Sequence, residues 1–230
     1  MTVLITGGSG LLGTEVRGIL TRMSIPYLAP SHCDMDILDR RSLEANISNP
    51  QVKFVFHAAA LTSPPVCSRE PQKTIEANVV GTINVLDTCR KHNKKLVYIS
   101  TDYVFDGDKG SYSVDDPINP INLYALTKAA AELAVRTYEN TLVIRTSFCE
   151  KQFPYEKAFI DQFTSRDYVD VIAPLIVEAS LSERRGVVHI GTERKSVYEL
   201  ALRRSPNVKK LTRKQVDFPV PYDTSFKQEK

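Results

Sequence analysis

The chain has 230 residues, of which 42% are hydrophobic and 25% are charged, and its formal net charge is +3. This length fits one domain, or one domain with a small appendage, and can bury a sizeable core. The small net charge does not indicate a nucleic-acid or membrane partner, and no apolar run approaches the ~20 residues of a spanning helix. We therefore expect no nucleic acid and no membrane among its partners.

The cysteines and histidines bear on the cellular compartment and on metal binding. Four cysteines (Cys33, Cys67, Cys89 and Cys149) are scattered without a C-x-x-C pair, which is typical of reduced thiols in a reducing compartment. The four histidines lack metal-ligand spacing, so we predict no metal site. Because the first strand is predicted to start at Thr2, there is no room for a signal or transit peptide. We expect a cytoplasmic protein.

A glycine-rich turn follows the first predicted strand, Thr2 to Ile5. It leads into an amphipathic stretch through Arg22, and strand, glycine turn and helix form the context that a G-x-x-G-x-x-G motif requires. The glycines allow a tight turn, close approach to a pyrophosphate and close helix packing, and the helix N-terminus offers N–H groups to phosphates. The alternative is a glycine turn without a ligand. The predicted cofactor-binding residues of this turn are Gly7, Gly10, Leu11, Leu12 and Gly13.

The end of the second predicted strand, Ile25 to Ala29, bears on the choice between NADPH and NADH. An acidic residue there would bind the adenosine ribose hydroxyls of NADH. The chain instead reads Pro30-Ser31-His32, and Ser31 and His32 could meet a 2′-phosphate. We therefore predict NADPH, with NADH possible and with a solvated loop as the alternative role for His32.

Three further segments carry candidate cofactor contacts. Asp36 and Ile37 could flank an adenine, and the nearby Asp39 is a plausible N-cap of a helix through Ile47. A buried strand from Val52 to Phe56 precedes His57, and the small residues Ala58, Ala59 and Ala60 allow a flat cofactor to lie against the backbone. Residues 61–71 contain three prolines and predict a loop. On the long helix predicted from Gln72 to His92, Asn78 could tie the helix to its neighbours, reach the site or lie on the surface.

A tyrosine and a lysine lie four residues apart on the helix predicted from Pro120 to Glu139. This spacing puts Tyr124 and Lys128 on one face, and a nearby positive charge lowers the pKa of a phenol. Such a tyrosine can donate a proton to a forming alkoxide. The strand from Lys95 ends at Ser100, a further candidate cofactor contact, and at Thr101, which could hold a substrate carbonyl oxygen. Residues 106–119 predict a loop that could cover the substrate.

Strands and helices alternate through the strand predicted from Thr141 to Arg145, which favours a parallel sheet covered on both faces. After about Thr146 the pattern is weaker. We predict a helix from Arg166 to Val177, capped by Thr164-Ser165 and kinked or stopped at Pro174. We also predict a strand over 186–191 and a capping box at Ser196 that opens a helix to Arg204. The tail from Phe218 is expected to be extended and partly loose. The basic run is either a solvated face or a diphosphate contact, and it comprises Lys209, Lys210, Arg213 and Lys214.

Four features of the sequence carry a resemblance to a known family. They are the glycine turn, the alanines after the third strand, the segment Ser100-Thr101-Asp102-Tyr103-Val104-Phe105-Asp106-Gly107 and the segment Pro120-Ile121-Asn122-Leu123-Tyr124. Together they resemble the extended short-chain dehydrogenase/reductase superfamily. Within it they look like the dTDP-4-dehydrorhamnose reductase group, specifically over residues 1–147. The resemblance implies an α/β fold, a Rossmann-like doubly wound parallel sheet over 1–147. It also implies a small, shortened C-terminal substrate-binding part over 148–230, some of whose elements return to the sheet.

The resemblance implies that Thr101, Tyr124 and Lys128 are catalytic and that the lysine also holds the nicotinamide ribose. The implied reaction is reduction of the 4-keto group of a nucleotide-linked 6-deoxy sugar, by a monomer or homodimer. The chain departs from the group at His57, where asparagine is usual, and at Ala125, where glycine is usual. The alternatives are a non-catalytic regulatory subunit, which some members of the group are, or a sugar-nucleotide epimerase or dehydratase.

Overall fold

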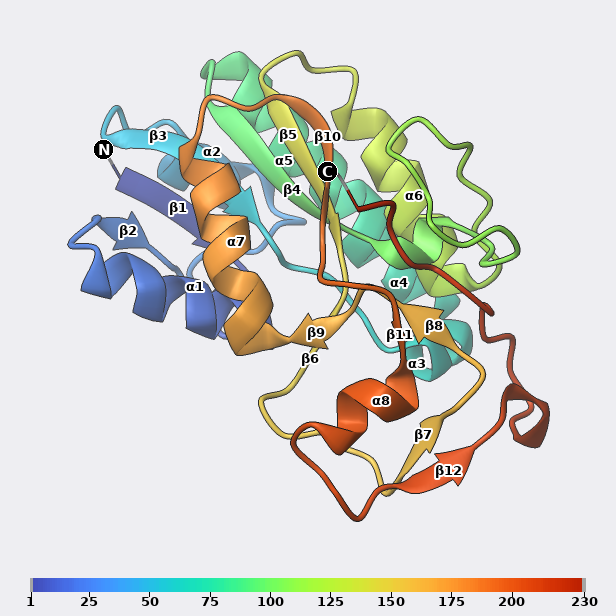
Figure 1. Cartoon of the computed structure of the whole chain (residues 1–230). Helices are drawn as coiled ribbons and strands as arrows, with labels where there is room; N and C mark the ends of the chain where they lie inside the picture. The colour runs from blue at the N-terminus through green and yellow to red at the C-terminus, as the bar shows by residue number, and fades with distance from the viewer. Residues whose placement is uncertain (1, 229–230) are drawn as a thin grey trace.

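The computed structural model describes residues 2–228 and has a parallel six-stranded sheet at its centre (Figure 1). The strand order is β10-β5-β4-β3-β1-β2, so the order reverses between β1 and β3. This confirms the predicted doubly wound sheet. The strands of the sheet are β1 (Thr2–Thr6), β2 (Tyr27–Leu28), β3 (Val52–His57), β4 (Lys95–Thr101), β5 (Thr141–Thr146) and β10 (Gly186–Ile190).

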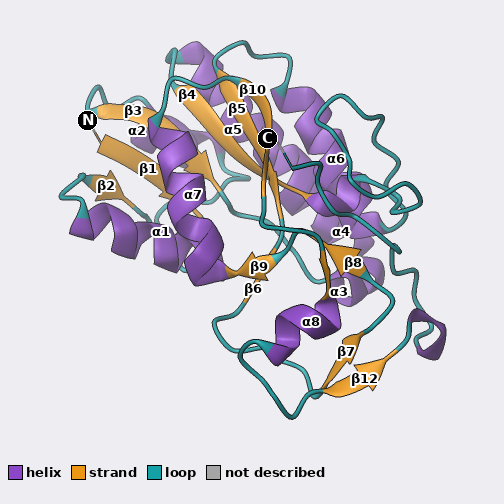
Figure 2. Ribbon diagram, in the orientation of Figure 1, coloured by secondary structure: helices purple, strands orange, loops and turns teal. Residues whose placement is uncertain are grey.

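Helices cover both faces of the sheet, as Figure 2 shows. On one face α1 packs beside α7 over an apolar layer, and on the other α2, α5 and α6 cover a second apolar layer. Because both faces are covered, β4 and β5 are buried along their whole length. The helices are α1 (Leu11–Arg22), α2 (Arg40–Ile47), α5 (Gly81–Lys91), α6 (Leu123–Val135) and α7 (Val169–Leu181).

The segment before β4 is more helical than predicted. The helix predicted over 72–92 is confirmed as a continuous helical run, α4 (Pro71–Ile75), the π-helical η1 (Glu76–Val80) and α5. The predicted loop over 61–71 is wrong in its middle, where α3 (Pro64–Arg69) forms. Two prolines occupy the first turn of α3, where a missing N–H disrupts no helical hydrogen bond.

Side-chain caps set several helix starts. The predicted caps are confirmed at Asp39, whose carboxylate accepts from the Arg41 N–H, and at Ser196, which forms a capping box with Glu199. The helix predicted from Pro120 starts only at Leu123, because the Asn122 side chain accepts from the Ala125 N–H at 2.9 Å.

The predicted start of α7 is wrong. The helix begins at Val169 rather than Arg166, and the hydroxyls of Thr164 and Ser165 bond to other parts of the chain. The predicted stop at Pro174 is also wrong, because the helix continues to Leu181, and the predicted kink there stays a prediction. Among residues 2–228, no helix combines the length and the apolar character that a membrane crossing needs.

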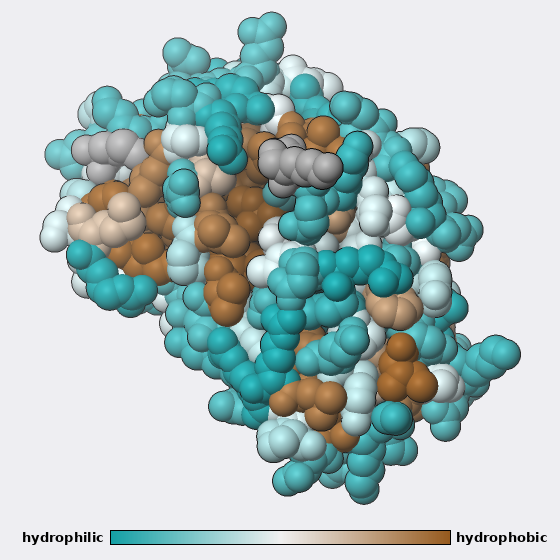
Figure 3. Space-filling view, in the orientation of Figure 1, coloured by the Kyte–Doolittle hydropathy of each residue, from teal (hydrophilic) through white to brown (hydrophobic). Residues whose placement is uncertain are grey.

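The rest of the chain forms a small second part from short pairings. Here β6 pairs with β9, β7 with β12, and β8 with β11, and a separate cluster of buried apolar side chains lies beneath α8. Figure 3 shows that apolar surface gathers where α7 crosses the sheet, while the small part is mostly hydrophilic. The remaining elements are η2 (Asp102–Val104), β6 (Phe148–Cys149), β7 (Lys157–Phe159), β8 (Phe163–Thr164), β9 (Asp167–Tyr168), β11 (Lys195–Ser196), α8 (Val197–Leu202), β12 (Lys209–Leu211) and η3 (Arg213–Gln215).

The prediction of a partly loose tail is wrong for residues 223–226, whose side chains are all 5% exposed or less. Their burial depends on hydrogen bonds to residues more than 60 positions earlier in the chain, such as the bond from the Phe226 N–H to the Ser165 hydroxyl. Local sequence cannot indicate such contacts.

Candidate active site

Strand β4 and helix α6 bring the predicted threonine, tyrosine and lysine together. Thr101 ends β4, and Tyr124 lies in the first turn of α6. The side chains are close enough for the Thr101 hydroxyl to lower the pKa of the Tyr124 phenol. Lys128 follows one turn later on the same helix face, and its Nζ lies 4.1 Å from the centre of the Tyr98 ring. A hydroxyl, a phenol and an amine therefore meet beside the carboxyl end of β4.

Burial sets the proton affinities of this group. It raises the pKa of Tyr124 above its ordinary value of 10 and outweighs the opposing effect of Thr101. Burial also lowers the pKa of Lys128 to about 7, against the opposing effect of Glu132. Desolvation dominates at both groups, so the net pKa of Tyr124 is raised, and the effect of a charged Lys128 on it stays a prediction. Tyr124 remains a protonated phenol at neutral pH, which is the form that can donate a proton.

His57 is fully buried at the end of β3 and is a neutral ring. Burial and, to a lesser extent, Lys128 lower its pKa to about 3. The Thr82 hydroxyl donates to the Asn78 carbonyl at 2.7 Å, so it accepts from His57 Nε2, 2.9 Å away. The Thr6 hydroxyl then donates to Nδ1 at 2.7 Å. His57 therefore ties β1 and β3 to the helical run after them.

Asn78 continues this network to the tyrosine. The side chain is 1% exposed, so the surface alternative is wrong. Its Oδ1 accepts from the Leu61 N–H at 2.8 Å, and its Nδ2 donates to the Thr127 hydroxyl at 3.0 Å. Thr127 in turn donates to the Tyr124 carbonyl at 2.8 Å. The asparagine therefore fixes the first turn of α6, and a contact with a cofactor stays a prediction.

The glycine turn packs tightly against the alanines that follow β3. Gly7 has φ of +70°, and a Cβ there would lie 2.7 Å from the Ala59 backbone nitrogen. A Cβ at Gly13 would collide with the Gly7 carbonyl oxygen. Gly10 precedes α1 and is exposed, and no side chain of the described residues caps the start of this helix. With Ala58 after the neighbouring strand, these residues lie at the point where the strand order reverses, which is where ligands bind in such sheets.

Arg17 is a candidate that the sequence analysis missed. Its Nη1 donates to the Gly8 carbonyl at 3.4 Å, and its guanidinium lies 6.0 Å from the Tyr27 ring centre. A Cβ on Gly8 would lie 2.9 Å from the Ala29 Cβ, so this cation lies between the glycine turn and the end of β2. Its Nε is buried and has no hydrogen-bond partner within residues 2–228. The available clue was its position one turn past Gly13.

The other predicted cofactor residues lie in different settings. His32 is exposed, and the Ser31 hydroxyl donates to a nearby aspartate at 2.6 Å. The Asp36 carboxylate accepts from a backbone N–H two residues later. Ile37 is 9% exposed and packs in the apolar layer under α5. The Ser100 hydroxyl donates to a buried glutamate of α6 at 2.6 Å. Contacts of these five with a cofactor stay predictions.

Asp102 is a buried carboxyl beside the threonine, and the sequence analysis gave it no role. It is 2% exposed, and three threonine hydroxyls lie within hydrogen-bond distance of it. Thr101 is 3.3 Å from Oδ1, while Thr164 and Thr224 donate to Oδ2 at 3.2 and 2.7 Å. Burial raises the pKa of Asp102, although Arg166 and the hydroxyls oppose this. Two of its partners come from the C-terminal part, far away in sequence.

Arg166 is a cation beside Asp102 and Tyr103. Its Nε donates to the Ser147 hydroxyl at 2.9 Å, and no carboxylate lies within ion-pair distance among the described residues. It is close enough to Tyr103 and Asp102 for both to raise its pKa, although burial opposes them. Tyr103 also accepts from Gln162 at 3.2 Å. The predicted basic run, by contrast, lies on and after β12 at the outer end of the small part (Figure 1).

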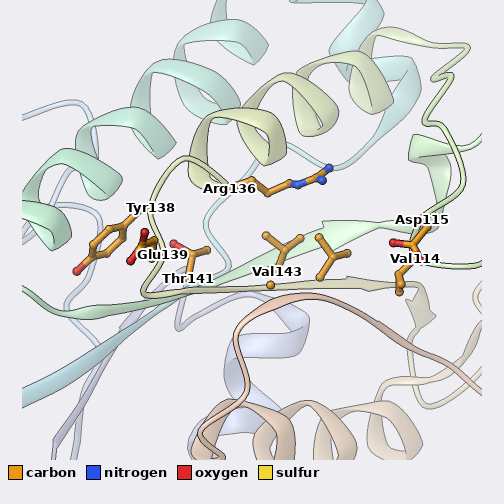
Figure 4. A pocket seen from close by; sticks show the side chains of 9 residues that line it. Val114, Asp115, Arg136, Tyr138, Glu139, Thr141 and Val143 are labelled. Carbon is orange, nitrogen blue, oxygen red and sulfur yellow. The ribbon is translucent and has the colours of Figure 1, made fainter.

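A separate pocket of about 280 Å³ lies away from this group (Figure 4). Its floor is β5 and β10 near their first residues, and Arg136 extends over it from the end of α6. The Thr141 hydroxyl at its edge is buried and unpaired within the described part of the chain. Because the tyrosine and threonine lie at the opposite, carboxyl end of the sheet, this pocket is not the predicted site.

Comparison with known proteins gives a family match. A family model described as "RmlD substrate binding domain" matches residues 1–177. The dTDP-4-dehydrorhamnose reductase of Aggregatibacter actinomycetemcomitans is 30% identical over 179 residues, which are 76% of this chain and 61% of that protein. The chain spans about half the length of other bacterial relatives.

Two further similarities are to proteins of different kinds, a subunit of another enzyme and a reductase. Methionine adenosyltransferase 2 subunit beta of Xenopus tropicalis is 29% identical, with 86% of this chain and 69% of that protein covered. Among solved structures, a dTDP-4-dehydrorhamnose reductase from Bacillus anthracis in complex with NADP has a TM-score of 0.89 at 24% identity. That match covers 99% of this chain and 90% of the other, and it confirms the fold.

Proposed function

The chain belongs to the RmlD substrate binding domain family, and we propose that it is an NADPH-dependent reductase of the 4-keto group of a nucleotide-linked 6-deoxy sugar. The observation that carries this proposal is the position of Tyr124 beside Thr101, with Lys128 one turn behind. The substrate class follows from the relatives, among which the Aggregatibacter protein is named a dTDP-4-dehydrorhamnose reductase.

The residues around the glycine turn fit a dinucleotide. The N–H groups at the start of α1, which no side chain within residues 2–228 caps, suit a pyrophosphate, and Gly7 packs on Ala59 too closely for a side chain. The unpaired Nε of Arg17 suits a 2′-phosphate, because a guanidinium binds phosphate oxygens through several N–H groups. Arg17 therefore favours NADPH, while NADH remains the alternative cofactor.

In this proposal the chain holds the carbonyl and supplies a proton. NADPH, when bound, supplies the hydride that reduces the carbonyl carbon. Thr101 binds the carbonyl oxygen, and Tyr124 transfers its phenolic proton to that oxygen as the alcohol forms. Lys128 stabilises the resulting phenolate when it is charged, and its pKa of about 7 makes this charge sensitive to pH near neutrality. Holding the reacting groups in register lowers the entropic part of the barrier.

Arg166 is the residue that we assign to the anionic part of the substrate. It is part-buried, held at one end by Ser147, and without an ion-pair partner among residues 2–228. A diphosphate is the anion that a sugar nucleotide presents, and an arginine fork matches it.

A nucleotide-binding subunit without turnover is the second candidate. The similarity to methionine adenosyltransferase 2 subunit beta favours it, because that alignment covers more of this chain than the one to the Aggregatibacter reductase. The two candidates differ in whether Tyr124 has a chemical role, so one substitution separates them.

The test is NADPH oxidation in the presence of dTDP- or UDP-4-keto-6-deoxy sugars. We expect turnover by the wild type and a loss of at least ~100-fold in Tyr124→Phe, as is usual when a general acid is removed. NADPH binding, followed by nicotinamide fluorescence, should remain. Tyr155→Phe is the matched control, since that phenol is 68% exposed and lies in the small part. NADPH binding without turnover of any such sugar would favour the subunit.

A further inference from the structure

The last described residues form a strap between the small part and the loop that follows β4. The strap, residues 222–228, leaves the small part and runs past β8 to the loop beside α6 (Figure 1). Backbone hydrogen bonds hold it on both sides. The Phe163 N–H donates to the Tyr222 carbonyl at 2.7 Å, and the Tyr112 N–H donates to the Ser225 carbonyl at 2.8 Å. The strap therefore joins the small part to the loop that follows β4.

Two glycines allow the strap to lie this close. Gly107 and Gly110 in the loop after β4 have φ of +87° and +68°. A Cβ on Gly107 would lie 2.6 Å from the Pro221 Cβ, and one on Gly110 would lie 2.5 Å from an Asp223 carboxylate oxygen. The loop is therefore fastened to the strap.

One strap residue reaches the active site. Thr224 is 1% exposed and donates to Asp102 Oδ2 at 2.7 Å, the shortest of the three threonine contacts with that carboxyl. Thr164 donates to the same oxygen at 3.2 Å. With Oδ2 taken by two donors, Oδ1 is the oxygen that faces Thr101.

This arrangement holds the Thr101 oxygen in place. The Thr101 hydroxyl has one proton and two lone pairs. It accepts from the Tyr103 N–H at 3.1 Å, lies 3.3 Å from Asp102 Oδ1, and is close enough to Tyr124 to lower the pKa of that phenol. If the Asp102 carboxyl is ionised, Thr101 donates to Oδ1, and if the carboxyl is protonated on Oδ1, Asp102 donates to Thr101. The bond holds the Thr101 oxygen in either state.

We infer that Thr224 is a positioning residue of the active site. Its hydrogen bond holds the Asp102 carboxyl so that Oδ1 faces Thr101, and the carboxyl thereby fixes the position of the Thr101 oxygen beside Tyr124. This inference rests on the proposed function, because it assigns Thr101 the contact with the reacting oxygen. The titratable and charged groups that face Asp102 are Arg166 from the small part and Tyr124 from α6.

Three variants test the inference. Thr224→Val removes the hydroxyl and keeps the shape, Thr224→Ser keeps the hydroxyl, and Ser225→Ala is the matched control from the same strap. Ser225 is fully buried, and its hydroxyl accepts from the Ser111 N–H rather than contacting Asp102. For each variant we would measure kcat, KM and the pH dependence of kcat. The titration of Asp102 would be followed by 13C NMR of labelled aspartate carboxyls, assigned with Asp102→Asn.

In Thr224→Val we expect kcat to fall about tenfold, as for loss of a hydrogen bond to a charged group, with KM for NADPH unchanged. The Asp102 carboxyl should titrate at higher pH, because a donor to its ionised form is lost. Thr224→Ser should restore both properties. Ser225→Ala should change neither, even if it lowers the melting temperature.

The inference is wrong if Thr224→Val keeps the wild-type kcat and Asp102 titration, or if Ser225→Ala reproduces both changes. The carboxyl titration also separates this inference from the proposed function. If the wild type turns over no sugar, a titration shift in Thr224→Val that Thr224→Ser reverses still supports the link between strap and Asp102. An unchanged titration overturns that link.

Discussion

The two parts of the molecule are held together in different ways. The part built on the central sheet has two continuous apolar layers, one on each face, and its strands pair along most of their length. The small part has strands of two or three residues and a buried cluster of eight apolar side chains. Ion pairs on its surface supplement that cluster, including Arg203 with Asp167 and Arg204 with Asp170.

This difference indicates a division of labour. Thr101, Tyr124 and Lys128 all come from the sheet part, where packing on both sides fixes their positions. Arg166 and Thr224, the residues that we assign to substrate binding and to positioning, come from the small part and the strap. In the proposed function the chemistry therefore depends on the sheet part, and specificity depends on the small part, which is held by fewer apolar contacts.

The largest expected loss of stability occurs in the sheet part when a buried ion pair is broken. Arg145 is 1% exposed and donates to the fully buried Glu132, with the shortest contact at 2.7 Å. Arg145→Met should lower the free energy of unfolding by ~3–5 kcal/mol, because the buried carboxylate keeps, among the described residues, only the Ser100 hydroxyl and the more distant Arg136, 3.9 Å away. Urea denaturation measures this. The double variant Arg145→Met with Glu132→Met should recover most of the loss, and an equal loss in both would contradict the assignment to an uncompensated charge.

A second effect comes from the buried lysine and depends on pH. Lysine titrates near 10.5 in the unfolded chain, and burial lowers the pKa of Lys128 to about 7 in the folded one. Between these values the unfolded state holds the extra proton, so this group makes stability rise by ~1.4 kcal/mol per pH unit. Lys128→Met should therefore be more stable than the wild type by roughly 5 kcal/mol below pH 7. The gain should vanish above about pH 10.5.

The measurement is urea denaturation of wild type and Lys128→Met from pH 6 to pH 10. Lys95, whose pKa burial lowers to about 8, is present in both proteins, so its contribution cancels in the difference. A difference that stays constant across this range would show that Lys128 titrates normally.

A third effect concerns cofactor binding beside the glycine turn of the sheet part. Arg17→Ala should weaken NADPH binding ~10- to 100-fold, since a charge-assisted hydrogen bond contributes ~1.5–3 kcal/mol. Binding of NADH, which lacks the 2′-phosphate, should change less than ~3-fold. Fluorescence titration with both cofactors measures this, and Arg22→Ala, an exposed arginine of the same helix, is the control. Equal weakening for both cofactors would remove Arg17 from phosphate recognition.

The smallest effect concerns the small part alone. Arg166→Gln should raise KM for the sugar nucleotide about tenfold, equivalent to ~1.4 kcal/mol, and should change kcat less. Lys210→Ala, in the exposed basic run, is the control and should change KM less than ~2-fold. If the lysine variant has the larger effect, the diphosphate lies on the basic run instead.

Much of the sheet part could be predicted because its determinants are local. Continuous apolar runs such as Val52 to Phe56 mark buried strands, the glycine turn marks the first crossover, and Asp39 and Ser196 mark helix starts. The tyrosine and lysine were found because a helix places residues four apart on one face.

The rest depends on contacts between residues far apart in sequence. Thr164 looked like a helix cap, yet its hydroxyl bonds to Asp102, 62 positions away. Thr224 lies in a tail with no periodicity and reaches the same carboxyl. The raised pKa of Tyr124 also depends on burial by the whole fold, which a neighbouring lysine in the sequence does not reveal.

The most direct test of the account compares wild type and Tyr124→Phe in one assay, with matched saturation by NADPH. The account predicts that the wild type consumes NADPH when a 4-keto-6-deoxy sugar nucleotide is added and that the variant binds NADPH but consumes it at least ~100-fold more slowly. Consumption at the same rate by both proteins would contradict it.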